Sequence, residues 1–215
     1  MTSLAAHIEH TCLRADATPR DVACLCSDAA THSLFGVCVS PLYVSLAKEA
    51  LRGTAVRVVT VAGFPLGAAT AGVKSFEAEN AVLEGADEVD MVMAVGLALA
   101  GHWTEVEADI RAVRTRIPRA VLKVILETGY FDDGGIRRAA EAAVRAGADF
   151  VKTSTGFGPR GATVEDVRVL HDVVQGRARV KASGGIRTVE QARSFLEAGA
   201  TRIGTSNGVE IARTS

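Results

Sequence analysis

The sequence predicts a single-domain (β/α)8 TIM barrel, and three features of the chain support this prediction. Short runs rich in β-branched residues alternate with longer amphipathic segments along all 215 residues. One glycine-containing segment recurs three times, which indicates that a single βα unit is reused. Aromatic residues make up only 5% of the chain, so the core must come from small aliphatic side chains, as in parallel strands buried on both faces.

Eight candidate strands follow one another at intervals of roughly 25–30 residues, the spacing of a compact barrel of this kind. Their expected ranges are Ile8–Leu13, Phe35–Val39, Val56–Ala62, Glu88–Met93, Val121–Leu126, Phe150–Thr153, Arg179–Ala182 and Arg202–Gly204. A doubly wound open sheet is the alternative fold, but no Gly-x-Gly-x-x-Gly motif opens a helix early in the chain. No linker or low-complexity stretch divides the sequence, so we expect one domain over residues 1–215.

The segments between the strands carry helix signals. Four of them start with a hydroxyl residue followed by proline or by a capping-box acid or amide. These starts are Thr18-Pro19, Ser40-Pro41, Thr163-Val-Glu-Asp166 and Thr188-Val-Glu-Gln191. From His102 to Ile117 the apolar residues recur at helical spacing, and Pro118 ends the segment. The three related segments, Glu84–Asp90, Ala146–Lys152 and Ala198–Gly204, each place a glycine between a helix and the next strand.

The overall charge excludes several kinds of partner. The 24 basic and 25 acidic residues give a net charge of −1, without the basic surface that nucleic acid or an anionic membrane requires. No apolar stretch is long enough to span a bilayer, and the N-terminus lacks the pattern of a signal peptide. The four cysteines suit reduced thiols in a cytoplasmic protein. We therefore expect a small-molecule partner held by a local site.

Charged residues interrupt strands that are otherwise apolar. Strand side chains alternate between the two faces, so valines that pack outward against helices leave their neighbours pointing into the barrel. The residues expected inside are Asp90, Lys123, Lys152 and Lys181. A buried ion pair, or lysines that extend to the strand ends, would be a purely structural explanation. Burial of several like charges is costly, however, which favours a functional site at the carboxyl ends of the strands.

Clustered lysines suggest a specific chemistry. A lysine amine is nucleophilic only when deprotonated, and both burial and a neighbouring ammonium lower its pKa from the usual value of about 10.4. Such an amine can form a Schiff base with a carbonyl substrate, which favours aldol cleavage, aldol addition or enolisation. A carboxylate such as Asp90 could then transfer protons, directly or through water.

Glycine-rich loops follow the last three predicted strands. They are Thr153–Gly158, Ser183–Gly185 and Gly204–Gly208. In this fold phosphate often binds at the loops after strands seven and eight, which correspond to the last two of these segments. Glycines also occur in ordinary tight turns, so these loops have two interpretations, a phosphate-binding site or a set of structural turns. The five histidines are scattered without ligand spacing, and we therefore expect no catalytic metal.

Taken together, these segments resemble the deoxyribose-phosphate aldolase family, in the family's order and over nearly the whole chain. The matching stretches are Ile8–Leu13 with Asp16–Thr18, Val37–Pro41, Gly63–Gly67, Glu88–Val92, Leu122–Thr128, Phe150–Gly156, Lys181–Arg187 and Gly204–Ser206. The resemblance implies reversible cleavage of 2-deoxyribose 5-phosphate to glyceraldehyde 3-phosphate and acetaldehyde, without a metal or organic cofactor. Barrels of this kind often pair, so we also expect a homo-oligomer, a dimer or a tetramer.

The resemblance also implies roles for individual residues. Lys152 corresponds to the Schiff-base lysine, Lys181 to a second lysine that lowers the pKa of the first, and Asp90 to the acid of the proton relay. The positions that correspond to phosphate-binding loops are Gly184, Gly185, Gly204, Thr205 and Ser206. Lys123 is a supporting lysine, and Cys38 and Thr11 correspond to positions that line the pocket.

Three positions depart from the family's pattern: Glu9 in place of Asp, Arg14 in place of Lys, and Ala94 in place of Asn. We expect these substitutions to affect the rate, the substrate preference and the stability of the protein more than the type of reaction. Two other functions stay open. One is an imine-forming aldolase for another phosphorylated sugar, and the other is a catalytically weak barrel that only binds a sugar phosphate.

Overall fold

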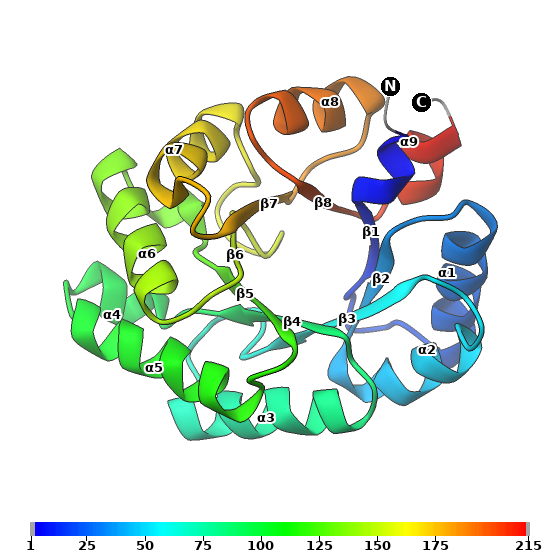
Figure 1. Ribbon diagram of the computed structural model, residues 1–215, viewed down its shortest axis with the longest axis horizontal. Coiled ribbons are helices and arrows are strands. Elements are labelled where there is room, and N and C mark those ends of the chain that lie inside the picture. Colours follow the sequence, from blue (N-terminus) through cyan, green and yellow to red (C-terminus); the bar gives the residue numbers. More distant parts are fainter. Residues whose placement is uncertain (1–2, 214–215) are drawn as a thin grey trace.

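The computed structural model describes residues 3–213 and contains a closed barrel of parallel strands (Figure 1). Each strand is hydrogen-bonded to the next, and β8 pairs with β1 to close the barrel. The strands are β1 Ile8–Cys12, β2 Gly36–Val39, β3 Arg57–Ala62, β4 Glu88–Val92, β5 Val121–Ile125, β6 Phe150–Lys152, β7 Arg179–Ser183 and β8 Arg202–Thr205. The predicted (β/α)8 fold is confirmed, and the open-sheet alternative is wrong. The prediction of one domain over residues 1–215 reaches beyond the described residues and stays a prediction.

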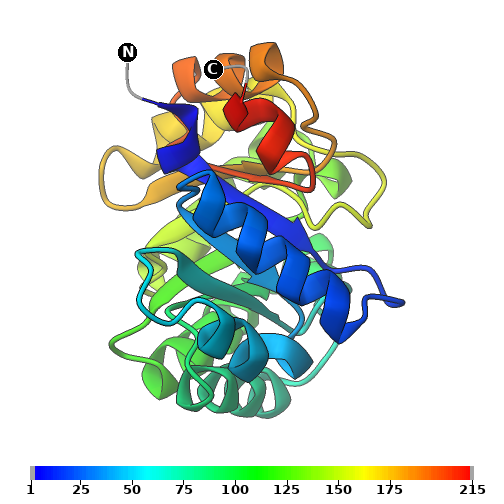
Figure 2. The same ribbon diagram turned by 90° about the vertical axis from the view of Figure 1, so that its right-hand side faces the viewer.

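Helices form a ring outside the barrel, as the views along and across it show (Figures 1 and 2). They are α1 Pro19–Thr31, α2 Val44–Ala50, α3 Ala71–Leu83, α4 Val95–Leu99, α5 Trp103–Arg116, α6 Asp133–Arg145, α7 Val164–Val174, α8 Val189–Glu197 and α9 Gly208–Arg213. Short 3-10 helices lie at Leu4–His7, Pro41–Tyr43 and Thr128–Tyr130. Within residues 3–213, no helix has both the length and the apolar character needed to cross a membrane.

Three of the four predicted helix starts are confirmed. Thr18, Thr163 and Thr188 each cap a helix, and each shares a reciprocal capping box with the residue three positions later. The prediction at Ser40 is wrong, because its side chain makes no capping hydrogen bond. Its proline starts a 3-10 turn instead, so the α-helix begins only at Val44.

The alternation of side chains along the strands determines what fills the barrel. Val89, Val151 and Val180 are buried in the large apolar core of the protein. The residues that follow them, Asp90 and two lysines, point the other way, into the barrel. Cys38 on β2 and Val59 and Val61 on β3 form a small apolar cluster that is separate from the large core. The charged interior predicted from the strand pattern is therefore present.

Candidate active site

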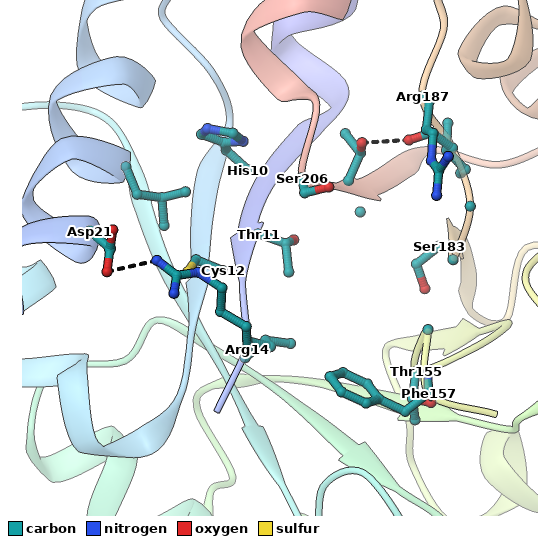
Figure 3. Close-up of a pocket in the computed structure, with 18 of the residues that line it drawn as sticks. His10, Thr11, Cys12, Arg14, Asp21, Thr155, Phe157, Ser183, Arg187 and Ser206 are labelled. Carbon is teal, nitrogen blue, oxygen red and sulfur yellow. Dashed lines mark hydrogen bonds and ion pairs between the residues drawn. The ribbon is translucent and has the colours of Figure 1, made fainter. Parts of the chain in front are cut away.

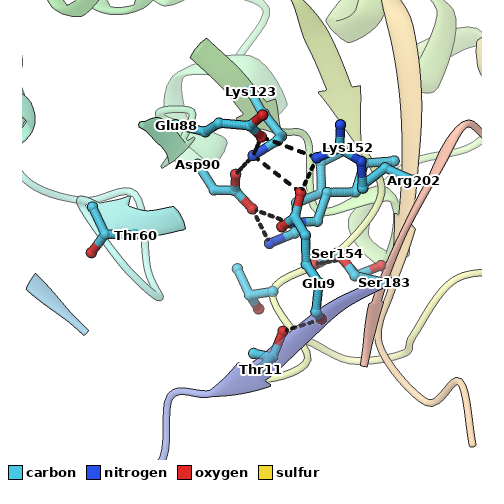
Figure 4. Close-up of polar contacts among 12 residues, drawn as sticks. Glu9, Thr11, Thr60, Glu88, Asp90, Lys123, Lys152, Ser154, Ser183 and Arg202 are labelled. Atoms are coloured by element: carbon cyan, nitrogen blue, oxygen red, sulfur yellow. Dashed lines mark hydrogen bonds and ion pairs between the residues drawn. The ribbon is translucent and has the colours of Figure 1, made fainter. Parts of the chain in front are cut away.

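Asp90 on β4 is in contact with all three barrel lysines (Figure 4). Its Oδ1 accepts a hydrogen bond from Lys123 Nζ at 2.8 Å. Its Oδ2 accepts two, from Lys152 Nζ and from Lys181 Nζ, each at 2.7 Å. The strand register explains this convergence, since Lys123 lies beside Asp90 on β5 and Lys152 lies beside Lys181 across β6 and β7.

Sequence analysis missed a second set of charges that supports these lysines. Glu9 contacts Lys181 Nζ and lies 2.7 Å from Arg202 Nη1, and Glu88 lies 3.1 Å from the same nitrogen. The Arg202 guanidinium also stacks 3.3 Å from the centroid of the Phe35 ring. Glu9, Glu88 and Arg202 all lie in predicted strands, so the alternation that revealed the lysines could have revealed them too. Glu9, noted above only as a departure from the family, is completely buried in this network.

The three lysines differ in how many carboxylates they contact. Lys123 Nζ contacts three, namely Asp90, Glu9 at 3.3 Å and Glu88 at 2.6 Å. Lys181 contacts two. Among the described residues Lys152 contacts a single carboxylate, that of Asp90, through an oxygen that it shares with Lys181. With Arg202, four cationic groups thus face three carboxylates. A buried cluster with one excess positive charge favours loss of a proton, and the lysine with the fewest carboxylate contacts loses it at the lowest cost.

The pKa directions agree with this count of contacts. Burial lowers the pKa of Lys152, Asp90 opposes this effect, and the neighbouring Lys181 ammonium adds to the lowering. For Lys181, burial also acts to lower the pKa, but Asp90 and Glu9 together raise it. Burial likewise acts to lower the pKa of Lys123, but Asp90, Glu9 and Glu88 together raise it above its usual value. Lys152 is therefore the amine of this cluster that most readily becomes a neutral nucleophile.

The carboxylates of the cluster are held in their charged form. Burial alone would raise the pKa of Asp90, but the three lysine ammoniums hold it well below its usual range. Burial would also raise the pKa of Glu9, but the ammonium groups of Lys123 and Lys181 lower it to about 2. Asp90 can therefore accept a proton only when one of its contacts with the lysines changes.

A cavity of about 620 Å³ opens above this cluster at the carboxyl ends of the strands (Figure 3). Of the four charged residues predicted inside the barrel, only Lys152 lines the cavity. The other predicted residues that line it are Thr11, Gly184, Gly185, Gly204, Thr205 and Ser206. Lys123, Lys181 and Asp90 are buried below it and do not line its wall. Access to the cavity thus distinguishes Lys152 from the other two lysines.

The phosphate-loop candidates form one side of the cavity. Gly184 and Gly185 have φ angles of 93° and 80°, which favour glycine. A Cβ atom on Gly204 would lie 3.1 Å from Lys181 Cε, so this glycine lets β8 approach the lysine closely. Arg187, which sequence analysis left out of the site, also lines this side, near Ser183 and Ser206 (Figure 3). Within residues 3–213 no carboxylate forms an ion pair with Arg187. Its place two residues after Gly185 was the signal that the sequence offered.

Cys38 lies deeper than predicted, buried below the cavity wall. Burial raises the pKa of its thiol to about 11. Ligand atoms of Glu9, Cys38 and Asp90 lie within 4.8 Å of one another, close enough to hold a cation in principle. Both carboxylates already bind ammonium groups, however, and the thiol stays protonated, so the set does not favour a metal ion. The expectation of metal-free chemistry stays a prediction.

Two of the departures from the family's pattern lie outside the cluster of lysines and carboxylates, and one of them, Arg14, lines the same cavity as Lys152. Arg14 forms ion pairs with Asp16 at 2.8 Å and Asp21 at 2.7 Å, on the side of the cavity opposite Arg187 (Figure 3). Ala94 precedes α4 and does not line the cavity. The replacement of Asn by Ala at position 94 therefore does not alter the residues that line the cavity.

A buried lysine that has a lowered pKa and lines a cavity at the mouth of a barrel is typical of the class I aldolases, in which the imine formed by such a lysine serves as the electron sink. The comparisons with known proteins agree with this class. The family model for DeoC/LacD family aldolases matches residues 5–214, and the chain belongs to this family.

Relatives match over nearly their full length. The chain is 54% identical to a deoxyribose-phosphate aldolase of Deinococcus radiodurans, over 97% of this chain and 95% of the relative. It is 56% identical to one of Thermus thermophilus, over 97% of this chain and 94% of the relative. A solved tetrameric deoxyribose phosphate aldolase of Aeropyrum pernix superimposes with a TM-score of 0.91 at 34% identity, covering 98% of this chain and 90% of that one.

Proposed function

We propose that the protein cleaves 2-deoxyribose 5-phosphate reversibly to glyceraldehyde 3-phosphate and acetaldehyde, through an imine on Lys152. The observation that carries this proposal is the position of Lys152, which has one carboxylate contact, a lowered pKa and access to the cavity. The names of the relatives support the choice of substrate. Incubation with the sugar phosphate should release the two aldehydes in equal amounts, and a different pair of carbonyl products would identify another phosphorylated sugar as the substrate.

The chemistry needs a nucleophile and a group that moves protons. The neutral Lys152 amine adds to the C1 aldehyde, and loss of water gives the iminium ion. The C2–C3 bond breaks as a base takes the proton of the C3 hydroxyl, which releases glyceraldehyde 3-phosphate. Protonation of the remaining enamine at C2 and hydrolysis of the iminium release acetaldehyde and restore the lysine. Asp90, within hydrogen-bond reach of Lys152, moves these protons directly or through water.

Lys181 acts on the pKa of Lys152 in this proposal, while Lys123 keeps Asp90 and the two glutamates in place. Lys181→Met removes a positive charge near Lys152 and frees Asp90, and both changes raise the pKa of Lys152. The acidic limb of the kcat/KM profile should therefore move to higher pH. A matched control is Lys48→Met, since that lysine pairs with Asp87 on the surface and should leave the profile unchanged. An unshifted profile in Lys181→Met would show that the two lysines are not coupled.

We propose that the phosphate group lies against the loops of Gly184, Gly185, Gly204, Thr205 and Ser206. Backbone N–H groups of such loops and the guanidinium of Arg187 suit a dianion. The location of these residues on one side of the cavity, at the ends of β7 and β8, supports this assignment.

Arg187→Met should raise KM for deoxyribose 5-phosphate about 10- to 100-fold, the value of one charge-assisted contact. Activity on unphosphorylated deoxyribose should not change, because that substrate has no group for the guanidinium to bind. Arg193→Met on the exposed side of α8 serves as the control. An equal loss of activity with both substrates would place Arg187 outside the phosphate site.

We also propose that the protein forms a homo-oligomer, a dimer or a tetramer. The tetrameric relative supports assembly, as does an exposed apolar stripe of Val73, Phe76 and Leu83 along α3. A mass measurement in solution distinguishes these states from a single chain. A cytoplasmic location is also a proposal, and the four free cysteines of the structure support a reducing compartment.

A further inference from the structure

Glu127, directly after β5, has an unusual backbone conformation. Its φ angle is 53°, in the left-handed region that residues other than glycine rarely adopt. The flanking residues keep regular contacts with the next strand, since Leu126 N donates to Lys152 O at 2.9 Å and Thr128 N to Thr153 O at 3.0 Å. Glu127 thus behaves like a bulge residue, whose side chain is turned away from the regular alternation of the strand. Such strain persists where the surrounding structure demands it.

The side chain of Glu127 is buried, with 3% of the residue exposed, and it binds one loop residue. Its two carboxylate oxygens accept from Thr155 N at 3.1 Å and 3.3 Å. One of them also accepts from the hydroxyl of Thr155. Within residues 3–213 no ion pair to Glu127 is formed. A buried carboxylate without a cationic partner is costly, and here the hydrogen bonds from Thr155 offset that cost.

The loop between β6 and α7 is shaped around this carboxylate. A Cβ atom on Gly158 would lie 2.6 Å from Glu127 Cδ, so only glycine lets the loop pass this closely. Thr155 Oγ1 also accepts from Phe157 N at 3.0 Å, which continues the hydrogen bonds along the loop. The segment Thr155–Phe157 lines the cavity, and its first residue is three positions after Lys152. The wall of the cavity beside Lys152 therefore depends on a carboxylate that does not itself line it.

We propose that Glu127 is a positioning residue, which holds Thr155 and thereby fixes the segment Thr155–Phe157 as a wall of the substrate cavity. The proposal rests on the proposed function, because it assigns this wall to the sugar phosphate. The wall contacts the body of a substrate that reaches from Lys152 to the glycine loops. It should matter much less for acetaldehyde, whose two carbons extend little beyond the imine.

The test compares Glu127→Ala and the isosteric Glu127→Gln with the wild-type protein, with Glu165→Gln as a control for removal of an exposed carboxylate. Borohydride trapping of Lys152 is measured once with deoxyribose 5-phosphate and once with acetaldehyde, alongside kcat and KM. Glu127→Ala should lower trapping and kcat/KM with the sugar phosphate about 10- to 100-fold, since misplaced groups cost this much. Trapping with acetaldehyde should keep its wild-type rate. Glu127→Gln retains one acceptor oxygen and should lie between the wild type and Glu127→Ala.

The other outcomes have distinct meanings. Wild-type values for both Glu127 variants with the sugar phosphate would overturn the positioning role. An equal loss of trapping with both aldehydes would also overturn it, because the effect would then lie on Lys152 and its strand. If Glu127→Ala does not fold, the ratio of the two trapping rates in Glu127→Gln decides between these results. A wild-type protein that traps neither aldehyde would instead overturn the proposed function itself.

Discussion

Replacement of Lys152 by alanine should abolish imine formation and lower the rate of cleavage on the order of 10⁴-fold or more, the usual result of losing a covalent nucleophile. Lys123 and Lys181 cannot replace it, because their carboxylate contacts raise their pKa values and neither lines the cavity. The measurement is kcat/KM for deoxyribose 5-phosphate together with borohydride trapping.

The fold should tolerate Lys152→Ala. Asp90 keeps its contacts with Lys123 and Lys181, so no buried carboxylate loses its last cation. The variant should therefore still bind the sugar phosphate, which separates lost chemistry from lost structure. Lys48→Ala, far from the cavity, is the matched control. Imine trapping at the wild-type rate in Lys152→Ala would assign the nucleophile to another lysine.

Asp90→Asn should produce the second largest effect, a loss of about 10²- to 10⁴-fold in kcat, as expected for an acid–base group. The amide cannot take a proton from the substrate. It also leaves four cations facing two carboxylates, so the pKa of Lys152 should fall further, because Asp90 acts to raise it. The acidic limb of the pH profile should thus move to lower pH, opposite to the shift expected for Lys181→Met.

The controls for Asp90→Asn address stability and binding. Removal of one partner from a buried ion network costs about 3–5 kcal/mol, so the melting temperature must be measured alongside the rate. Affinity for the sugar phosphate should persist, since Asp90 does not line the cavity. Asp16→Asn, an exposed acid near the cavity, should leave the rate unchanged. A folded Asp90→Asn variant with full activity would remove Asp90 from the proton relay.

The barrel could be predicted from the sequence because strand alternation and helix caps are local signals. Each observed strand differs from its predicted range by one residue at one end. The same alternation placed Asp90 and the three lysines inside the barrel, where the structure has them. The prediction at Ser40 failed because a hydroxyl residue before a proline is compatible with both an α-helix and a 3-10 turn.

What the sequence could not predict depends on which strands lie side by side. The ranking of the lysines comes from Glu9 and Glu88, whose contacts with them span up to 172 residues of sequence. The depth of Cys38 and the contact of Glu127 with Thr155 likewise depend on the register of strands and on the path of a loop. Arg187 carried a signal, its position after two glycines, but only the cavity shows that it faces the site.

Borohydride reduction of the wild-type protein in the presence of deoxyribose 5-phosphate, followed by peptide mass analysis, tests the central claim most directly. A reduced imine on the peptide that contains Lys152, with Lys123 and Lys181 unmodified, is the expected result. An adduct on Lys181 or Lys123 would contradict the ranking of the lysines by carboxylate contacts. Absence of any adduct, with the sugar phosphate still bound, would contradict the aldolase mechanism and indicate a barrel that only binds its ligand.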